Sequence, residues 1–449
     1  MKSISVWQDL NDIKEYPILS ENKEVDVLII GGGLTGISTI YHLRDSNLKV
    51  MLVEQNKIGM AVTGKSTGKL SYLQNDLIDK IRNGLGNDIA LKYIKSQIST
   101  IENIKKVIKK EKINCDLEEV DSYLYTNNNS EISKLKALKD FLNSNGIICE
   151  EDNKYVVKSK YMFKVKNTYV FHPIKFVYGL LKNNKYPIFE NTSIKNIKKE
   201  DNYYICYTNS CKIKAKWVVM ASHYPHFIFP YLFPLKANLE KSYISCSKYN
   251  GSPISLISYS NPFISLRTYQ NNLLYLSNSH SINIDVCDKD NFNELLKKVH
   301  DLKLEPDYIW SNIDVMTSDG LPYIGKIKDR LLIGTGYNTW GLTNGFLAGK
   351  ILSDIIVGNN NEYVDLFSPK RKNIKQFIGG FLNTYKTISG LVNGSLNKSD
   401  KNLKCPHVGC GLIYNEIEKT WDCPCHGSRF DNNGKCISGP ANKDIDIKQ

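Results

Sequence analysis

The sequence predicts a mixed α/β protein with a small separate domain at its C-terminus, and three observations predict this fold. The chain of 449 residues is long enough for two or three domains with a sizeable core. Near its N-terminus an apolar run leads into a glycine-rich turn, which is typical of a buried parallel strand followed by a helix. Five of its 11 cysteines crowd between Cys405 and Cys436, which indicates a metal site more than a disulfide scaffold.

The composition is that of an ordinary globular protein, with 41% hydrophobic and 23% charged residues. No stretch approaches the roughly 18 to 20 apolar residues of a membrane span, and the opening MKSISVWQDL lacks the apolar run of a signal peptide. We therefore expect a cytoplasmic protein. The formal charge of +13 is spread over the chain without basic runs interleaved with aromatic residues, which argues against a nucleic-acid partner.

A dinucleotide-binding fingerprint follows the first predicted strand. Residues 25–30 read VDVLII and lead into G-x-G-x-x-G, formed by Gly31, Gly33 and Gly36 with Thr35 inside it. A helical pattern and a second apolar strand follow, and that strand ends at Glu54. A glycine-rich turn in another kind of α/β protein would not predict an acidic residue at this spacing.

Each part of the fingerprint has a mechanical reason. Gly31 permits the tight turn, Gly33 lets a pyrophosphate approach the backbone, and Gly36 lets the helix pack close to the strand. The N-terminus of the helix faces the phosphate charge. Glu54 lies at the spacing of the carboxylate that binds ribose hydroxyls.

The choice between FAD and NAD depends on the rest of the chain. We find no second G-x-G-x-x-G, which a reductase with two dinucleotides would carry. The loop after Glu54 contains Ser66, Thr67 and Gly68, small residues that could approach a flavin and its phosphates. The same loop could equally be a plain turn.

Three later segments complete a family pattern: WVVMASHYP (217–225), MTSDGLPYIG (316–325) and LLIGTGYNTWGLTNG (331–345). With the fingerprint, they resemble the D-amino-acid oxidase and glycine oxidase superfamily of FAD enzymes. The resemblance implies FAD and a Rossmann-like FAD-binding domain interleaved with an antiparallel-sheet substrate domain. It also implies further contacts to FAD, from Gly336, Trp340, Gly341 and Thr343.

The cysteine-rich tail contains two short loops, CPHVGC (405–410) and CPCHGS (423–428). Each loop offers a thiolate and an imidazole, which matches the mixed ligation in which two cysteines hold one iron and two histidines the other. A zinc ribbon is the alternative, because two Cys/His pairs could also hold zinc tetrahedrally. A ribbon would leave the C-P-C-H-G-S context unexplained.

The two loops resemble those of Rieske iron-sulfur proteins, especially of the type found in cytochrome bc complexes. The resemblance implies an all-β domain with a 2Fe-2S cluster. Its ligands would be Cys405, His407, Cys423 and His426, and a disulfide would join Cys410 to Cys425. It further implies that Ser428 donates a hydrogen bond to a cluster sulfur and that residues 439–441 cover one side.

Together these patterns predict a division of the chain. We expect an N-terminal extension (1–24), a discontinuous FAD-binding domain (25–78, 165–225 and 325–370), a substrate domain (79–164 and 226–324), a helix and linker (371–401), and the Rieske domain (402–449). The basic, amphipathic segment 371–401 is expected to pack on its own FAD domain; a helix on a membrane surface is the alternative.

Flavin chemistry moves two electrons at once, whereas a 2Fe-2S cluster passes one at a time. The fusion predicts an oxidoreductase that oxidises a small molecule and passes electrons singly to an external acceptor, either a protein or a quinone. Two alternatives remain: a reductase that receives electrons through the cluster, and a redox sensor without turnover. Flavin bleaching by substrate favours the first function, and flavin reduction only through a reduced donor protein favours the second.

The substrate is expected to differ from a simple amino acid. Where the amino-acid oxidases carry an arginine that clamps the substrate carboxylate, this chain has Asp314, and glycine oxidase's second arginine falls at Thr339. An acidic residue suits an amine better; the alternative is that Asp314 is a plain surface aspartate. Arg267 and His223 are further candidates for substrate contact; the alternative for Arg267 is a structural role.

Overall fold

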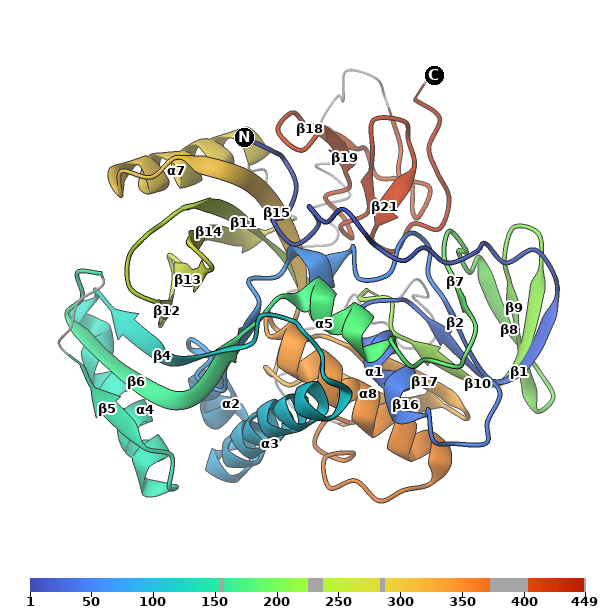
Figure 1. The fold of residues 1–449 in the computed structure, drawn as a ribbon, viewed down its shortest axis with the longest axis horizontal. Helices are drawn as coiled ribbons and strands as arrows, with labels where there is room; N and C mark the ends of the chain where they lie inside the picture. Colours follow the sequence, from blue (N-terminus) through green and yellow to red (C-terminus); the bar gives the residue numbers. More distant parts are fainter. Residues whose placement is uncertain (153–156, 225–236, 283–286, 372–402, 448–449) are drawn as a thin grey trace.

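The computed structural model describes residues 1–152, 157–224, 237–282, 287–371 and 403–447. These residues form three β-sheets with helices packed around the two larger ones, as Figure 1 shows. The third and smallest sheet belongs to the C-terminal domain, by which we mean residues 403–447.

The first sheet is built around short, apolar parallel strands. β1 (Lys23–Ile30) pairs in parallel with β2 (Val50–Val53) on one side and β10 (Lys212–Met220) on the other. β10 pairs in parallel with β17 (Leu331–Thr335). The remaining strands are β7 (Ile188–Phe189) beside β2, β16 (Tyr323–Lys328) beside β17, and the hairpin β8 (Asn196–Glu200) and β9 (Tyr203–Tyr207) beside β10. The sheet therefore collects strands from three distant parts of the chain.

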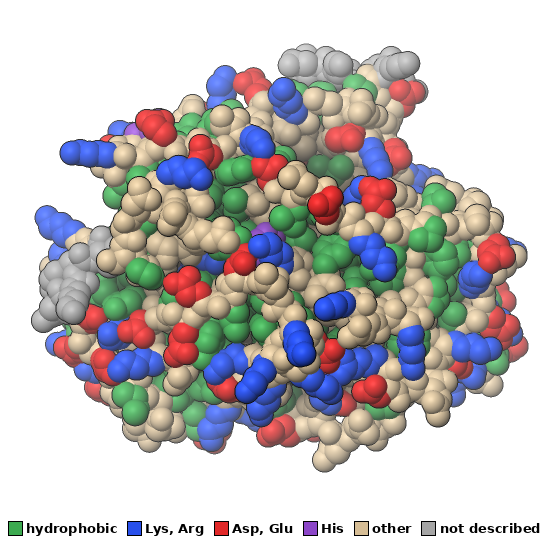
Figure 2. All heavy atoms as spheres, in the orientation of Figure 1, with side chains coloured by type: hydrophobic (Ala, Val, Ile, Leu, Met, Phe, Trp, Pro, Cys, Tyr) green, Lys and Arg blue, Asp and Glu red, His purple; other side chains and the backbone are tan. Residues whose placement is uncertain are grey.

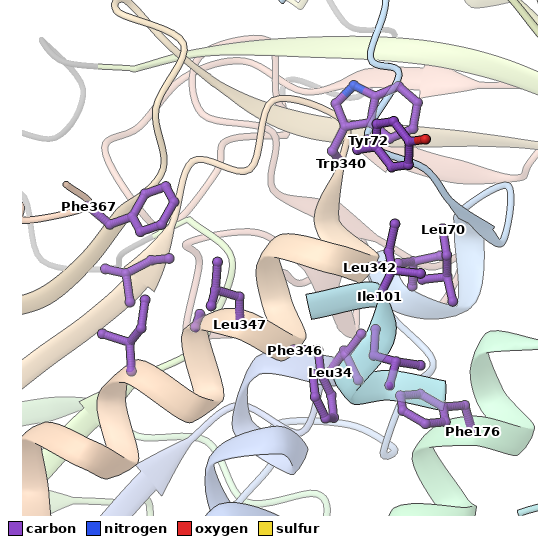
Figure 3. Close-up of a cluster of buried hydrophobic side chains, with 14 of the residues drawn as sticks. Leu34, Leu70, Tyr72, Ile101, Phe176, Trp340, Leu342, Phe346, Leu347 and Phe367 are labelled. Atoms are coloured by element: carbon purple, nitrogen blue, oxygen red, sulfur yellow. The ribbon is translucent and has the colours of Figure 1, made fainter. Parts of the chain in front are cut away.

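Three helices cover one face of this sheet: α1 (Leu34–His42), α5 (Pro173–Leu180) and α8 (Gly341–Val357). Figure 3 shows Leu34 of α1, Phe176 of α5 and Phe346 of α8 meeting in the interior. All three side chains are buried in the largest apolar cluster of the described residues. Burial of such side chains contributes about 1.5 to 3 kcal/mol each, which fixes α1 and α8 against the strands.

The second sheet is long, curved and mostly antiparallel. Its strands follow the order β15-β11-β14-β13-β12-β4-β6-β3, with β5 beside β6, and only β12 and β4 run parallel. Their bounds are β3 (Lys69–Leu70), β4 (Glu118–Thr126), β5 (Cys149–Glu151), β6 (Tyr161–Val170), β11 (Ala237–Lys248), β12 (Ser255–Ser258), β13 (Ser265–Tyr269), β14 (Asn272–Ser281) and β15 (Pro306–Thr317).

Helices lie at both ends of the second sheet. α7 (Asp288–Asp301) packs on β11 and β14 through the buried residues Phe292, Leu295 and Val299. The others are α2 (Leu77–Leu85), α3 (Asn87–Glu111) and α4 (Ile132–Ser144), with the 3-10 turns η1 (Val62–Lys65) and η2 (Asn129–Glu131). α3 also contacts α8 and so joins the two large sheets.

The C-terminal domain is all-β. Its sheet contains β18 (Ile413–Asn415), β19 (Thr420–Asp422), β20 (Arg429–Phe430) and β21 (Cys436–Ser438), paired antiparallel in sequence order. In Figure 1 it lies at the top, beside β15. The predicted class, a mixed α/β protein with a small all-β domain, is therefore confirmed.

Some sequence expectations meet the structure differently. β6 stays in the second sheet as far as Val170, beyond residue 165, where the FAD-binding segment was expected to resume. The expected helix and linker (371–401) lie outside the described residues except for Arg371.

Within the described ranges, no helix is long and apolar enough to cross a membrane. Figure 2 shows Lys and Arg side chains gathered over the lower part of one face, with acidic side chains among them.

Candidate functional site

The glycine-rich turn between β1 and α1 is packed so tightly that two of its glycines have no room for a side chain. Gly31 has φ +111°, and a Cβ there would lie 2.5 Å from the carbonyl oxygen of Ala221. A Cβ on Gly36 would lie 2.0 Å from the carbonyl oxygen of Gly31. The mechanical roles predicted for these two glycines are confirmed, because one makes the turn and the other lets α1 approach it.

Glu54 follows β2 and points at the same turn. Its carboxylate accepts hydrogen bonds from the backbone N–H of Gly32 (2.6 Å) and of Asn56 (2.8 Å). Burial raises the pKa of Glu54, and these backbone donors oppose that rise. The carboxylate therefore joins the turn to the loop after β2, where binding to ribose was predicted for it.

A cavity, which we call the dinucleotide cavity, runs from this turn to the second sheet. It is lined by eight of the predicted cofactor residues: Gly31, Gly33, Thr35, Glu54, Ser66, Thr67 and the pair Trp340–Gly341 at the start of α8. Four predicted residues do not line it: Gly36, Gly68, Gly336 and Thr343. The hydroxyl of Thr343 donates instead to Gln97 Oε1 at 2.6 Å, so its side chain faces away from the cavity.

Three large side chains donate hydrogen bonds to backbone carbonyl oxygens of the loop after Glu54. The indole of Trp7 donates to the carbonyl oxygen of Ser66 (2.6 Å), and the indole of Trp310 donates to that of Lys65 (2.8 Å). The guanidinium of Arg267 donates to the carbonyl oxygens of Thr67 (2.8 Å) and Phe171 (3.0 Å). These contacts agree with the structural alternative for Arg267, whose side chain is buried and does not line the cavity.

Sequence reasoning missed two lysines on the cavity wall, Lys65 and Lys69, although both lie in the loop that drew attention for its small residues. The ammonium of Lys69 donates to the carbonyl oxygen of Leu256 (2.7 Å) and to Ser265 Oγ (2.8 Å). Burial, and secondly the charge of Arg267, hold the pKa of Lys69 well below its usual value. The position of Lys65 and Lys69 shortly after Glu54 was the sequence signal that could have identified them as residues of the site.

The second sheet forms the floor of the cavity, by which we mean Glu240 and Ser242 on β11 with Asn312 and Asp314 on β15. Glu240 lies directly opposite Asp314 in the strand register, and Ser242 opposite Asn312. Burial, and secondly the charge of Glu240, raise the pKa of Asp314 to about 7. Asn312 donates to Asp314 Oδ2 (3.4 Å), and its own buried Oδ1 has no hydrogen-bond partner among the described residues.

His223 also lines the dinucleotide cavity, at the end of the segment after β10. Its backbone has φ +63°, a conformation unusual for a residue other than glycine. Burial lowers the pKa of His223 to about 4, so the imidazole is neutral near pH 7. The next residue, Tyr224, is buried with its ring centroid 6.0 Å from that of His426 in the C-terminal domain.

The C-terminal domain brings the four predicted ligands together at one end of its sheet. Cys405 and Cys423 form a hydrogen-bonded pair, and the rings of His407 and His426 lie 5.0 Å apart between centroids at 90°. A disulfide joins the two loops between Cys410 and Cys425, as expected. The sulfur atoms of Cys410, Cys423 and Cys425 also lie close together, but the disulfide leaves only Cys423 of these three as a thiol.

The chemistry of this donor set fits a 2Fe-2S cluster. The hydrogen bond between the two thiols lowers the pKa of Cys405 and raises that of Cys423, so the two sulfur atoms lie next to each other. Burial lowers the pKa of His426 to about 4, and its Nδ1 is buried without a hydrogen-bond partner in the described part of the chain. A neutral imidazole with a free lone pair is what metal ligation requires.

The neighbours of the ligands agree with the expected surroundings of a cluster. Ser428 is within hydrogen-bonding distance of the Cys405 sulfur, and its hydroxyl accepts a hydrogen bond from the backbone N–H of Ala441 (3.0 Å). A Cβ on Gly439 would lie 2.5 Å from the Cα of Ser428. Residues 439–441 therefore pack directly against the loop that carries Cys423 and His426.

Buried ion pairs hold the C-terminal domain on the second sheet. Arg429 pairs with Glu418 (2.6 Å) and with Asp422 (3.0 Å) inside the domain. Lys241 of β11 then bridges Asp422 and Asp288, at 2.7 Å from each. Although burial opposes it, the charge of Arg429 lowers the pKa of Glu418 to about 2, so this carboxylate stays ionised.

Comparisons with known proteins agree with both sites. The family model described as FAD dependent oxidoreductase matches residues 26–355, and the model described as Rieske [2Fe-2S] domain matches residues 401–448. A putative Rieske 2Fe-2S iron-sulfur protein of Bacillus subtilis (strain 168) is 27% identical over 98% of this chain and 96% of its own length. Gamma-glutamylputrescine oxidoreductase of Escherichia coli (strain K12) is 21% identical over 79% of this chain and 88% of its own.

Among solved structures, glycine oxidase from Geobacillus kaustophilus superimposes with a TM-score of 0.65 at 16% identity, over 78% of this chain and all of its own. At that identity the likeness concerns the fold.

Proposed function

The chain belongs to the FAD dependent oxidoreductase family and carries a C-terminal Rieske [2Fe-2S] domain, and from that premise we propose that it oxidises an amine and passes the electrons singly to an external acceptor. FAD and the 2Fe-2S cluster, both expected from the sequence, are confirmed as its cofactors by these matches. The direction of electron flow and the amine substrate are the proposed parts.

The proposed electron transfer from FAD to the cluster, which we call the relay, is supported by the position of the cluster ligands beside the dinucleotide cavity. His223 lines that cavity, and the ring of its neighbour Tyr224 faces the ring of His426. At this point the dipeptide His223–Tyr224 extends from the cavity wall to the ring of the predicted ligand His426. Such proximity favours transfer inside one molecule over transfer between molecules.

The residues of the two sites bind the cofactors and position the substrate. When bound, FAD supplies hydride chemistry and the cluster supplies transfer of single electrons. Glu54 and the turn from Gly31 to Gly36 would hold the dinucleotide, and the floor would orient the substrate. His223, which burial keeps neutral near pH 7, presents an uncharged imidazole at the cavity wall.

Several features of the floor support an amine as the substrate. Asp314, Glu240 and the Oδ1 of Asn312, for which the described part of the chain provides no hydrogen-bond partner, offer oxygen atoms to a cation. Thr339, the second position where relatives carry an arginine, also lines the cavity and has no charge. A relative across most of the chain is named for gamma-glutamylputrescine, which is itself an amine derivative.

The pH dependence of substrate binding tests the amine. Because the pKa of Asp314 is about 7 and an alkylammonium keeps its proton to about pH 10, binding should strengthen as pH rises through 7. Asp314→Asn should weaken binding by about tenfold to a hundredfold above pH 8, as expected for loss of one charge-assisted contact, and should flatten the profile. The measurement is flavin bleaching under anaerobic conditions against amine concentration, from pH 5.5 to 9.

Asp290→Asn provides the matched control, because Asp290 is an exposed carboxylate on α7 far from the floor in sequence and makes no contact with the cavity. It should leave the profile unchanged. If Asp314→Asn retains both the affinity and the pH profile of the unmodified protein, Asp314 does not bind the amine.

A further inference from the structure

Part of the C-terminal domain lies on the wall of the dinucleotide cavity itself. Ile437 and Ser438, at the end of β21, and Gly439 after it line this cavity beside Glu54. The same three residues also line a second cavity, between the two domains, to which His426 contributes. This short segment, residues 437–439, therefore separates the cofactor site of one domain from the cluster loop of the other.

The segment is fastened to the loop that follows Glu54. Asn56 donates through Nδ2 to the carbonyl oxygens of Cys436 (3.3 Å) and Ile437 (3.2 Å). Gln55 donates to the carbonyl oxygen of Cys436 (3.3 Å). Because Gln55 and Asn56 directly follow the carboxylate expected to bind the ribose, the segment covers the end of the site that would hold the ribose of FAD.

Two other contacts set the position of the segment. Asn442 donates to the carbonyl oxygen of Lys195 (3.0 Å), and the Lys195 ammonium in turn donates to the carbonyl oxygen of Asn442. On the opposite side, the φ of +95° at Gly439 and its tight packing on Ser428 leave no space for a shift toward the cluster loop. The segment is thus held between the FAD-binding domain and the cluster loop.

The docking of the whole domain depends on a buried cation of the second sheet. Lys241 is 4% exposed and bridges Asp422 of the C-terminal domain to Asp288. Lys241 does not line the dinucleotide cavity. Removing its charge would take from Asp288 its ion pair and leave Asp422 with Arg429 alone, which disfavours the docked arrangement.

We propose that residues 437–439 are part of the FAD-binding site, so that the C-terminal domain closes the site and retains the cofactor. The affinity for FAD then depends on docking of this domain, and by reciprocity bound FAD stabilises the docked domain. The inference concerns cofactor binding and goes beyond the relay, because it holds for either direction of electron flow and for any substrate.

The dissociation constant of FAD tests this proposal, measured from flavin fluorescence on the full-length chain. Ile437→Ala shortens a half-buried side chain on the wall and should weaken FAD binding about tenfold, since three carbons leave the contact. Lys241→Met should weaken it at least as much by loosening the docked domain. Lys289→Met is the matched control: it removes an ion pair to Glu416 between the same two domains, but both partners are exposed, and FAD affinity should not change.

Hydrogen exchange on the unmodified chain gives a second readout that needs no variant. With the cluster retained, removal of FAD should accelerate amide exchange in residues 436–441 and leave β19 (Thr420–Asp422) unaffected. Ile437→Ala with unchanged FAD affinity would overturn the proposal. An amide exchange rate in residues 436–441 that is the same with and without FAD would also overturn it. This second measurement tests the proposal even if Lys241→Met fails to fold.

Discussion

Replacing Cys423 by serine is expected to remove the iron-sulfur cluster, lowering the iron content from about two atoms per chain to near zero. Cys423 is buried and hydrogen-bonded to Cys405, so a hydroxyl in its place withdraws one of the two thiolates that face the same iron. The signal of the reduced cluster in electron paramagnetic resonance (EPR) should disappear. Amine should still bleach the flavin when FAD is supplied in excess, because Cys423 does not line the dinucleotide cavity.

The fifth cysteine of the C-terminal domain provides the control for this prediction. Cys436 is as buried as Cys423, and its sulfur donates to the carbonyl oxygen of Ala441 (3.2 Å). Cys436→Ser keeps a donor at this position and should retain iron and the EPR signal. Equal iron in both variants, or zinc in place of iron in the unmodified protein, would contradict the assignment of the ligands.

Replacing Gly31 by alanine is expected to abolish stable FAD binding. Its Cβ would lie 2.5 Å from the carbonyl oxygen of Ala221, so the turn must move away from β10. Overpacking against backbone costs about 3 kcal/mol, which corresponds to about a hundredfold loss of affinity. The measurement is the flavin content of the purified protein, followed by titration with FAD.

Gly86→Ala separates this contact from the general cost of replacing a glycine. Gly86 has φ +93°, close to the +111° of Gly31, but no atom lies within 4 Å of its added Cβ. The conformational cost is therefore similar in both variants, about 1 to 3 kcal/mol of stability. Gly86→Ala should bind FAD normally. A loss of FAD in both variants would mean that backbone conformation, and not the contact with Ala221, explains the first result.

The parts of the site that sequence alone predicted are those set by local geometry. Gly31 makes a tight turn, and Gly36 lets the helix that follows within six residues pack against this turn. The cluster ligands likewise lie in two short loops. The family match covers both regions. Such motifs carry their own spatial arrangement, because neighbours in sequence are neighbours in space.

The parts that sequence did not predict depend on contacts between distant segments. Glu240 faces Asp314 only because β11 and β15 pair in one particular register, and a shift of β11 by one residue would turn Glu240 to the face opposite Asp314. Arg267 shows the converse: its side chain has partners in two distant loops, and no local pattern distinguishes it from a substrate-binding arginine.

The contact between the domains was equally hidden from the sequence. Lys241 is a single lysine in a lysine-rich chain, and only its burial between Asp422 and Asp288 shows that it holds two domains together. Ile437 likewise has no sequence signal of a cofactor contact. Both follow from how the C-terminal domain lies against β11 and β15, which is decided by tertiary packing.

The relay is tested most directly by mixing the oxidised protein, under anaerobic conditions, with one equivalent of an amine that bleaches its flavin, and recording visible and EPR spectra without any other reductant. The account predicts that the EPR signal of the reduced cluster appears as the flavin bleaches. A bleached flavin beside a cluster that stays oxidised, and that gives its signal only after dithionite is added, would contradict it.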